Sequence, residues 1–224
     1  MKTVWITRTL PGAAATAARV EALGHAPLVA PLLDVVPLAP PALDFAGVVA
    51  LAFTSANGVR ALAGLSTRRD FPVFVVGSAT AASARAAGFA DIRSAQGGVA
   101  DLARLLTATR PTGAILHPGA LEPAGDLVGD LTAAGLSARA LAVYDTVPLA
   151  VPTEVLDRLA SIHAVLVHSP KAARRLAETL TANPAPDLDI LCLSPQVRNA
   201  LAAETDRRVL TAARPSEDAL LSLL

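Results

Sequence analysis

Short hydrophobic runs alternate with longer stretches rich in alanine and leucine along this chain. Most of the runs are continuously hydrophobic, a pattern typical of strands that are covered on both faces of a sheet. Most of the intervening stretches hold roughly 10 to 15 helix-forming residues, which predicts βαβ units and parallel sheets. We expect strands at residues 4–7, 27–30, 48–53, 73–76, 91–93, 114–116, 138–143, 164–167, 189–193 and 208–210.

Serines stand at several boundaries between a predicted strand and the helix that follows it. A serine hydroxyl at the start of a helix accepts a hydrogen bond from a backbone N–H group that would otherwise lack a partner. We therefore expect helices to begin at these serines, which are Ser55, Ser78, Ser169, Ser194 and Ser216.

Prolines interrupt the alternation at two places. No helix can run through the first stretch, which contains Pro31, Pro37, Pro40 and Pro41. A second stretch, at residues 147–152, contains Pro148 and Pro152. Each stretch stands where the pattern leads us to expect a helix. We interpret residues 34–38 and 144–148 as linkers between two domains, and we expect the domains to move about a hinge there.

Three pairs of segments repeat in the same order in the two halves of the chain. The pairs are residues 4–12 with 114–119, 52–62 with 166–176, and 75–80 with 191–196. This repetition predicts an internal duplication of about half the chain. The fold class that we predict is α/β, with two parallel-sheet lobes of flavodoxin-like form, joined by a two-segment linker. Duplicated lobes commonly enclose a cleft where a ligand binds.

Composition and charge exclude several classes of protein. The 224 residues are 53% hydrophobic, which excludes a disordered chain. The 19 basic and 19 acidic residues cancel, which argues against a nucleic-acid binder with a basic face. The single cysteine, Cys192, excludes an internal disulfide and fits a reducing compartment.

The hydrophobicity of the chain raises the question of a membrane segment. Asp34 and several prolines interrupt the longest candidate, so no run of about 18 hydrophobic residues remains. The stretch between Lys2 and Arg8 is too short for the hydrophobic region of a signal peptide. We expect a cytoplasmic protein without a membrane partner.

Hydroxyl side chains follow several predicted strands at the carboxyl edges of the sheets, where ligands bind in parallel α/β folds. They belong to Thr54, Ser55, Ser78, Thr80, Ser169 and Ser194. Together with the N–H groups of helix starts they could form a receptor for carboxylates or phosphates, which Arg8 would join as a charged donor. The alternatives are ordinary helix capping for the hydroxyls and a surface ion pair for Arg8.

Tyr144 is the one tyrosine of the chain and stands at the start of the second predicted linker. Its phenol can donate or accept a proton beside the predicted cleft, or it can simply pack at the hinge. The four histidines lack the spacing of metal ligands, and both a Walker phosphate loop and a G-x-G-x-x-G motif are missing from the sequence. We therefore expect neither a metal nor a cofactor.

The ordered set of motifs resembles the uroporphyrinogen-III synthase family over essentially the whole chain. The segments that carry the resemblance are residues 6–8, 31–33, 53–60, 76–81, 143–146 and 168–170. The resemblance implies that one lobe consists of residues 1–33 and 149–224, and the other of residues 39–143. It also implies a monomeric lyase of porphyrin and heme biosynthesis that closes hydroxymethylbilane into uroporphyrinogen III, inverts the last ring, releases water and uses no cofactor. The upstream hydroxymethylbilane synthase would be a transient partner.

The resemblance also assigns roles to individual residues. Tyr144 matches the linker tyrosine of the family and becomes the candidate catalytic residue. The candidate substrate-binding residues are Arg8, Ser55, Asn57, Thr80, Ser169, Lys171 and Ser194.

The sequence departs from the family pattern at two sites. Residues 194–197 read Ser-Pro-Gln-Val where the family commonly has a Gly-Pro-Thr-Thr-like stretch, and His168 stands where threonine or phenylalanine is more usual. Two alternatives to the enzyme therefore remain open. One is a two-lobed binding module for a small polyanion, and the other is a family member that has lost its activity.

Overall fold

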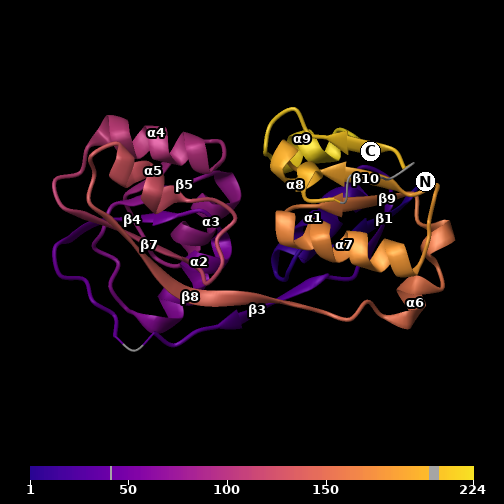
Figure 1. Cartoon of the computed structure of the whole chain (residues 1–224), viewed down its shortest axis with the longest axis horizontal. Helices are drawn as coiled ribbons and strands as arrows, with labels where there is room; N and C mark the ends of the chain where they lie inside the picture. Colours follow the sequence, from indigo (N-terminus) through magenta and orange to yellow (C-terminus); the bar gives the residue numbers. More distant parts are fainter. Residues whose placement is uncertain (41, 202–206) are drawn as a thin grey trace. The chain divides into compact units, whose positions relative to one another are not determined.

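The computed structural model describes residues 1–40, 42–201 and 207–224 of the chain (Figure 1). Contacts within the chain define two compact units, which we call unit 1 (Met1–Asp34 and Val147–Leu224) and unit 2 (Val35–Thr146). Unit 1 thus combines the two ends of the sequence, and unit 2 contains its middle. Pro41, the last proline of the first predicted linker stretch, lies outside the described residues.

Unit 1 is built on a parallel sheet with the strand order β11-β10-β9-β1-β2. The strands are β1 (Thr3–Ile6), β2 (Ala26–Val29), β9 (Ala164–Val167), β10 (Asp189–Cys192) and β11 (Val209–Thr211). If the five strands are numbered 1 to 5 in the order in which they occur along the chain, their order in the sheet is 2-1-3-4-5, as in flavodoxin-like sheets. The prediction of a parallel α/β fold is confirmed.

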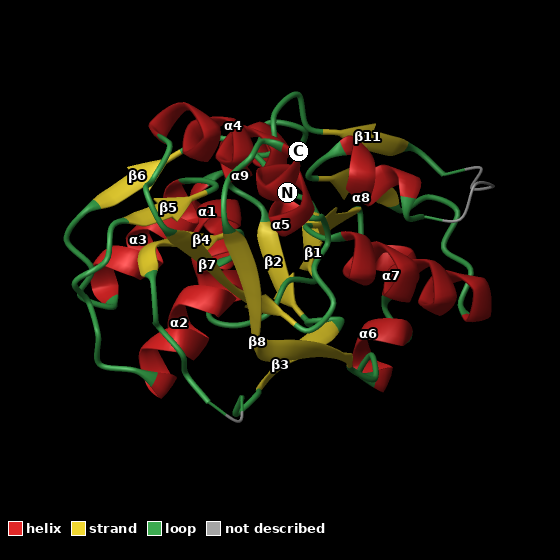
Figure 2. Cartoon of the chain, turned by 60° about the vertical axis from the view of Figure 1, so that its left-hand side comes forward, coloured by secondary structure: helices red, strands yellow, loops and turns green. Residues whose placement is uncertain are grey.

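Helices cover both faces of the unit 1 sheet (Figure 2). Val4 and Ile6 point to the face covered by α1 (Gly12–Ala22) and α9 (Glu217–Leu221). Trp5 points to the opposite face, which α7 (Pro170–Ala182) and α8 (Pro195–Asn199) cover together with α6 (Thr153–Leu156) and the short 3-10 helix η1 (Leu159–Ser161). Burial on both faces explains why these strands are continuously hydrophobic.

A second sheet, most of which belongs to unit 2, has the strand order β3-β8-β7-β4-β5-β6. The strands are β3 (Leu33–Pro37), β4 (Val48–Phe53), β5 (Val73–Val75), β6 (Ile92–Ser94), β7 (Ala114–Ala120) and β8 (Ala138–Pro148). The neighbouring pairs from β8 to β6 are parallel. The strands that the sequence repeat matches occupy equivalent places, because the order β8-β7-β4-β5-β6 corresponds to β2-β1-β9-β10-β11 in unit 1.

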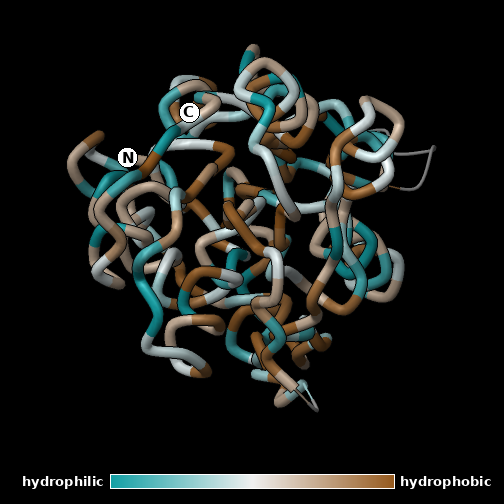
Figure 3. The backbone as a smooth tube through the Cα atoms, turned by 90° about the vertical axis from the view of Figure 1, so that its left-hand side faces the viewer, coloured by the Kyte–Doolittle hydropathy of each residue, from teal (hydrophilic) through white to brown (hydrophobic). Residues whose placement is uncertain are grey.

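The second sheet is likewise packed on both faces. Phe53 and Leu116 contact α2 (Ala56–Leu65) and α3 (Ser78–Ala86). Ile115 and Phe74 contact α4 (Val99–Thr109) and α5 (Leu127–Ala133) on the other face. Figure 3 shows the resulting alternation of hydrophobic and hydrophilic stretches along the chain. Within the described ranges, no helix combines the length and hydrophobicity that a membrane span requires.

The two segments that we predicted as linkers are strands in the structure. Residues 34–37 belong to β3, and residues 144–148 form the last part of β8. Leu38 N–H donates to the Val143 carbonyl at 3.0 Å, and Leu149 N–H donates to the Leu32 carbonyl at 2.9 Å, so the two segments run antiparallel. Pro37 is compatible with β3 because β3 is an edge strand, where a missing N–H donor does not break a ladder.

All five serines lie at helix starts, as predicted. Ser55, Ser169, Ser194 and Ser216 are N-caps whose hydroxyls accept a backbone N–H of the helix that follows. The capping role is wrong for Ser78, which is the first residue of α3, because Gly77 occupies the cap position in extended conformation. Glycine is also accepted at this position, so the helix begins one residue earlier than the serine suggests.

Two glycines of α2 provide a matched test of its packing. A Cβ atom at Gly58 would lie 2.5 Å from the Pro118 carbonyl oxygen, whereas one at Gly64 would have nothing within 4 Å. We expect Gly58→Ala to destabilise the chain by about 1–3 kcal/mol, since α2 must move away from β7. Gly64→Ala should stabilise it by about 0.5–1 kcal/mol through helix propensity alone. Urea unfolding measures both, and equal effects of the two substitutions would contradict the close contact.

Candidate functional site

The carboxyl edge of each sheet contains one place where the chain connections diverge. In unit 1 the connection after β1 leads to β2 and the one after β9 leads in the opposite direction to β10. In unit 2 the equivalent place lies between β7 and β4. Loops separate at such a switch point and leave a crevice for a ligand. Arg8 and Ser169 follow the two switch-point strands of unit 1, and Ser55 follows β4 in unit 2.

Tyr144 is placed at the switch point of unit 2 by strand pairing. It lies on β8, opposite Ala120 at the end of β7, and its carbonyl oxygen accepts the Leu121 N–H at 2.8 Å. The residue is 6% exposed, and its phenol hydrogen-bonds the Ser55 side chain. β7 lies between β8 and β4 in the sheet, so Tyr144 and Ser55 belong to strand ends that are not neighbours.

Ser55 connects the phenol to the start of α2. Its Oγ accepts the Asn57 backbone N–H at 3.1 Å, and the Asn57 side-chain oxygen accepts a hydrogen bond from the guanidinium of Arg60. Burial raises the pKa of Tyr144 above its ordinary value of 10.0, while the Ser55 hydrogen bond and the positive charge of Arg60 act in the opposite direction. The phenol is therefore protonated at neutral pH and can donate a proton.

Thr80 lies in the first turn of α3, at the carboxyl end of β5. The residue is 5% exposed and packs within unit 2, and α3 contacts α2. Thr80 and Ser55 thus belong to neighbouring helix starts on one edge of one sheet.

Three predicted site residues lie at helix starts of unit 1. Ser169 caps α7 by accepting the Ala172 N–H at 3.2 Å, and Lys171 is the second residue of that helix. Ser194 caps α8 by accepting the Val197 N–H at 3.4 Å. Both hydroxyl oxygens cap helices, which is the ordinary role that we considered as the alternative to substrate binding. Their role in substrate binding stays a prediction.

Arg8 takes part in a charged cluster of unit 1. Arg8 Nη1 donates to Glu217 Oε2 at 3.1 Å, and Thr16 Oγ1 donates to Glu217 Oε1 at 2.5 Å. His168 Nε2 donates to Glu217 Oε2 at 3.1 Å. An ion pair was the alternative role that we considered for Arg8, and in the structure its guanidinium does pair with Glu217. Its predicted contact with substrate is compatible with the pair, because an arginine carries five N–H donors.

The ionisation of this cluster follows from its contacts. Burial disfavours the charged form of Glu217, but hydrogen bonds from His168 and Thr16 and the charge of Arg8 outweigh it and lower the pKa of Glu217 from 4.5 to about 2. Burial lowers the pKa of His168 below its ordinary value, against the opposing effect of the Glu217 hydrogen bond. Glu217 is therefore an anion at neutral pH, with Arg8 as its cationic partner.

His117 lies beneath the switch point of unit 2. Its Nδ1 donates to the Ala52 carbonyl at 2.8 Å, and its buried Nε2 has no hydrogen-bond partner among the described residues. Burial lowers the pKa of His117, so the ring is neutral. Gly119 is needed beside it, since a Cβ atom there would approach Nε2 to 2.9 Å.

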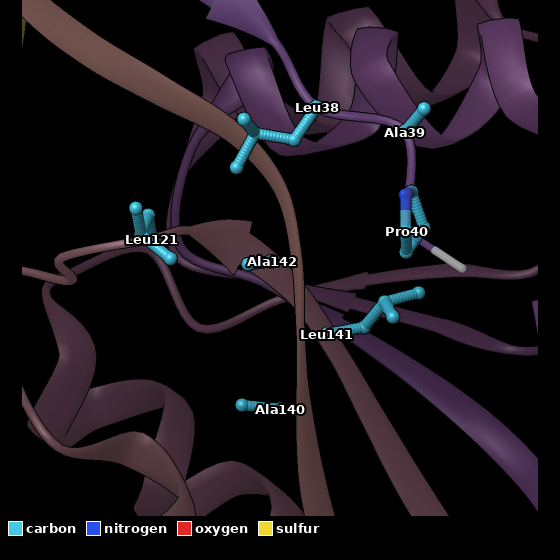
Figure 4. Close-up of a pocket in the computed structure, with 7 residues that line it drawn as sticks. All are labelled: Leu38, Ala39, Pro40, Leu121, Ala140, Leu141 and Ala142. Carbon is cyan, nitrogen blue, oxygen red and sulfur yellow. The ribbon is translucent and has the colours of Figure 1, made fainter. Parts of the chain in front are cut away.

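A shallow hydrophobic hollow also opens on unit 2, as Figure 4 shows. It has a volume of about 440 Å³ and is lined by Leu38, Ala39, Pro40, Leu121, Ala140, Leu141 and Ala142. None of these side chains can donate a hydrogen bond to an anion. The polar residues around Tyr144 are therefore the better candidate site of this unit.

The structure brings together part of the predicted site. Ser55, Asn57 and Tyr144 are linked within unit 2, where Thr80 follows the neighbouring strand β5, while Arg8, Ser169, Lys171 and Ser194 belong to unit 1. That Ser55, Thr80, Ser169 and Ser194 line a single cleft stays a prediction.

Sequence reasoning missed Arg60 and Glu217. The three-residue spacing from Asn57 to Arg60 on a helix could have revealed Arg60. Glu217 lies 209 residues from its partner Arg8 in the sequence, so no local pattern indicates the pair.

Comparisons with known proteins identify the relatives of the chain. A family model described as uroporphyrinogen-III synthase HemD matches residues 14–222. The uroporphyrinogen-III synthetase of Helicobacter pylori has a similar structure, with a TM-score of 0.65 and 15% identity, over 100% of this chain and 98% of that one. A mutant uroporphyrinogen III synthase of Thermus thermophilus gives a TM-score of 0.55 and 18% identity, over 100% and 97% of the two chains. No curated protein sequence matches the chain significantly.

The ionised Glu217 predicts a specific acid sensitivity. A carboxyl group whose pKa is lowered on folding stabilises the protein above its unfolded pKa and loses that effect as the pH falls through the folded value. The pKa of Glu217 is 4.5 in the unfolded chain and about 2 in the folded one. We therefore expect Glu217→Gln to lower the free energy of unfolding by roughly 3 kcal/mol at neutral pH, and the difference from the unmodified chain to vanish toward pH 2. Urea unfolding across this range is the measurement. The exposed Glu178→Gln, which loses only an ion pair with Arg175, is the control, and a pH-independent cost of Glu217→Gln would refute the assignment.

Proposed function

Because the chain belongs to the uroporphyrinogen-III synthase family, we propose that it converts hydroxymethylbilane into uroporphyrinogen III, as a lyase that releases water and inverts ring D without a cofactor. The observation that carries this proposal is the protonated phenol of Tyr144, held by Ser55 at the carboxyl edge of the unit 2 sheet. A departing hydroxyl group needs such a proton donor.

Capture of the substrate rests on donors at the ends of the strands. Hydroxymethylbilane carries many carboxylate groups, and helix N-termini bind anions through unpaired N–H groups and the helix dipole. The starts of α2 and α3 in unit 2 and of α7 in unit 1 offer such groups. Arg8 and Lys171 add positive charge in unit 1. In this proposal the donors hold the flexible chain, and the shape of the bound chain selects the inverted product.

The proton balance of the proposed reaction needs one group that first gives and later takes a proton. The phenol of Tyr144 donates its proton to the ring A hydroxyl as the carbon–oxygen bond breaks, and water leaves. The electrons of the pyrrole nitrogen stabilise the carbon left behind, which forms a carbon–carbon bond with the substituted α-carbon of ring D and so gives a spiro intermediate. The bond from that α-carbon to the bridge carbon between rings C and D then breaks, and the bridge carbon bonds instead to the free α-carbon of ring D, which inverts the ring. The ring carbon that loses its hydrogen on closure returns a proton to the phenolate, so the net change is the loss of water. The Ser55 hydroxyl can donate to the phenolate in the interval.

The direct test is the product formed from hydroxymethylbilane by the purified chain. Spontaneous closure in water gives the I isomer, so the two isomers can be separated and their ratio measured. The proposal predicts mainly the III isomer, formed faster than the spontaneous reaction. Formation of the I isomer alone, at the rate seen without protein, would refute the activity and would favour a binding module or an inactive family member.

Tyr144→Phe removes the phenol oxygen and keeps the ring. We expect turnover to fall by about 10²- to 10⁴-fold, which is the usual contribution of a general acid. The residual product should remain mainly the III isomer, because binding and shape control the inversion. Stability should change little, since the Ser55 hydroxyl keeps its bond to the Asn57 N–H.

Thr80→Ala should lower turnover less than Tyr144→Phe does, because neighbouring N–H groups share the role of the Thr80 hydroxyl. Rates and isomer ratios on hydroxymethylbilane test both variants, and a full rate for Tyr144→Phe would show that the phenol only packs.

A further inference from the structure

Arg8 is fixed at one end of its guanidinium and open at the other. Its Nη1 atom donates to Glu217 Oε2 at 3.1 Å and to Thr16 Oγ1 at 3.3 Å. Within the part of the chain that the structure describes, its Nε and Nη2 atoms have no hydrogen-bond partner. These two atoms form an edge of the guanidinium that can bind a carboxylate through two parallel hydrogen bonds. The side chain is 27% exposed and therefore remains in contact with solvent.

The carboxylate that holds Arg8 is itself fixed by two further donors. Thr16 Oγ1 donates to Glu217 Oε1 at 2.5 Å, and His168 Nε2 donates to Glu217 Oε2 at 3.1 Å. Both donors are themselves immobilised by packing, because Thr16 is 1% exposed and the His168 side chain is 9% exposed. Glu217 thus has little freedom to move, and the same holds for the Nη1 end of Arg8.

We propose that Glu217 is a positioning residue for Arg8: it fixes the guanidinium at the carboxyl edge of the unit 1 sheet, with the Nε–Nη2 edge directed to a carboxylate of the substrate. This inference rests on the proposed function, because it concerns the capture of the same polycarboxylate. It assigns a task to a residue that no motif of the sequence singled out.

Gly12 gives a second, independent support to the placement of this edge. A Cβ atom at Gly12 would lie 2.8 Å from Arg8 Nε and 3.0 Å from Arg8 Nη2, so the guanidinium lies against the backbone of the first residue of α1. A larger residue at this position would push the Nε–Nη2 edge away while leaving Glu217 in place. The position of the edge therefore depends on Glu217 at one end and on the missing side chain of Gly12 at the other.

Glu217 has two opposing effects on the binding of an anion by Arg8. Its negative charge weakens the attraction of the guanidinium for a substrate carboxylate, but water and salt screen this effect at a side chain that reaches solvent. Its hydrogen bond removes rotamers that a free arginine would lose on binding, and this ordering is not screened. In this proposal the ordering outweighs the charge, so removal of the charge should weaken binding.

Binding of uroporphyrinogen III, the proposed product, tests this placement without turnover. The product keeps the carboxylates of the substrate, and titration calorimetry without oxygen gives its dissociation constant with the full chain at neutral pH. One variant is Glu217→Gln, which keeps the size of the side chain and removes its charge. The other is Gly12→Ala, which displaces the Nε–Nη2 edge and leaves every charge in place. Glu217→Gln lowers the stability of the chain, whereas alanine favours the helix at position 12, so the second variant repeats the test in a stable chain.

Each variant has a matched control. Asp218→Asn removes the neighbouring carboxylate of α9, which pairs with Arg19 and so also joins α9 to α1. Gly64→Ala adds a methyl group to a helix at a position where a Cβ atom has nothing within 4 Å. Circular dichroism confirms that all four variants are folded under the conditions of the titration.

We expect the dissociation constant to rise by about 3- to 10-fold in Glu217→Gln and in Gly12→Ala, and to stay unchanged in both controls. KM for hydroxymethylbilane should rise in parallel while kcat changes little, because a binding contact and not the chemical step is affected.

Two outcomes for Glu217→Gln overturn the inference. A lower dissociation constant would show that Glu217 competes with the ligand for Arg8, and an unchanged one would show that the ion pair serves stability alone. An unchanged value in Gly12→Ala, or no binding by the unmodified chain, overturns it as well. If the unmodified chain binds the product but forms no III isomer, the proposed function fails, and the titrations still decide the role of Glu217.

Discussion

The pairing register of β8 with β7 is the constraint on which the candidate site depends. Tyr144 faces the end of β7 opposite Ala120, and from there its phenol reaches the Ser55 hydroxyl at the end of β4. A slip of one residue would turn the phenol to the other face of the sheet. Small residues lie at the end of β7, and α2 approaches β7 closely at Gly58. The packing of the sheet thus fixes where Tyr144 and Ser55 lie.

Unit 1 shows a different use of burial at the equivalent edge. There Glu217 accepts hydrogen bonds from Arg8, Thr16 and His168, and joins the start of α9 to α1 and to the ends of β1 and β9. The same low-polarity surroundings keep the phenol of unit 2 protonated and the carboxylate of unit 1 ionised, because only the carboxylate has several donors directed at it. The phenol of Tyr144 thereby keeps its proton, and the carboxylate of Glu217 is stabilised as an anion.

The sequence predicted most strands and helix starts, since continuous hydrophobic runs and serine caps are local signals. It missed β3, because Pro37 excludes a central strand but is tolerated at an edge, and it assigned the cap of α3 to Ser78, whereas Gly77 occupies that position. Tyr144 and Ser55 could be named from their motifs. Their hydrogen bond could not, because it joins residues on β8 and after β4 that meet only through the strand order β8-β7-β4. The pairing of Arg8 with Glu217 was hidden for the same reason.

The central claim is that the substrate reacts at the Tyr144 and Ser55 edge of unit 2. Membership of the uroporphyrinogen-III synthase family supports the reaction, and the phenol–hydroxyl contact supports the location. The most direct measurement is a crystal structure of the chain with uroporphyrinogen III bound. The account predicts product carboxylates at the start of α2 and the Tyr144 phenol oxygen facing the macrocycle. A product bound with both Tyr144 and Ser55 out of contact would contradict it.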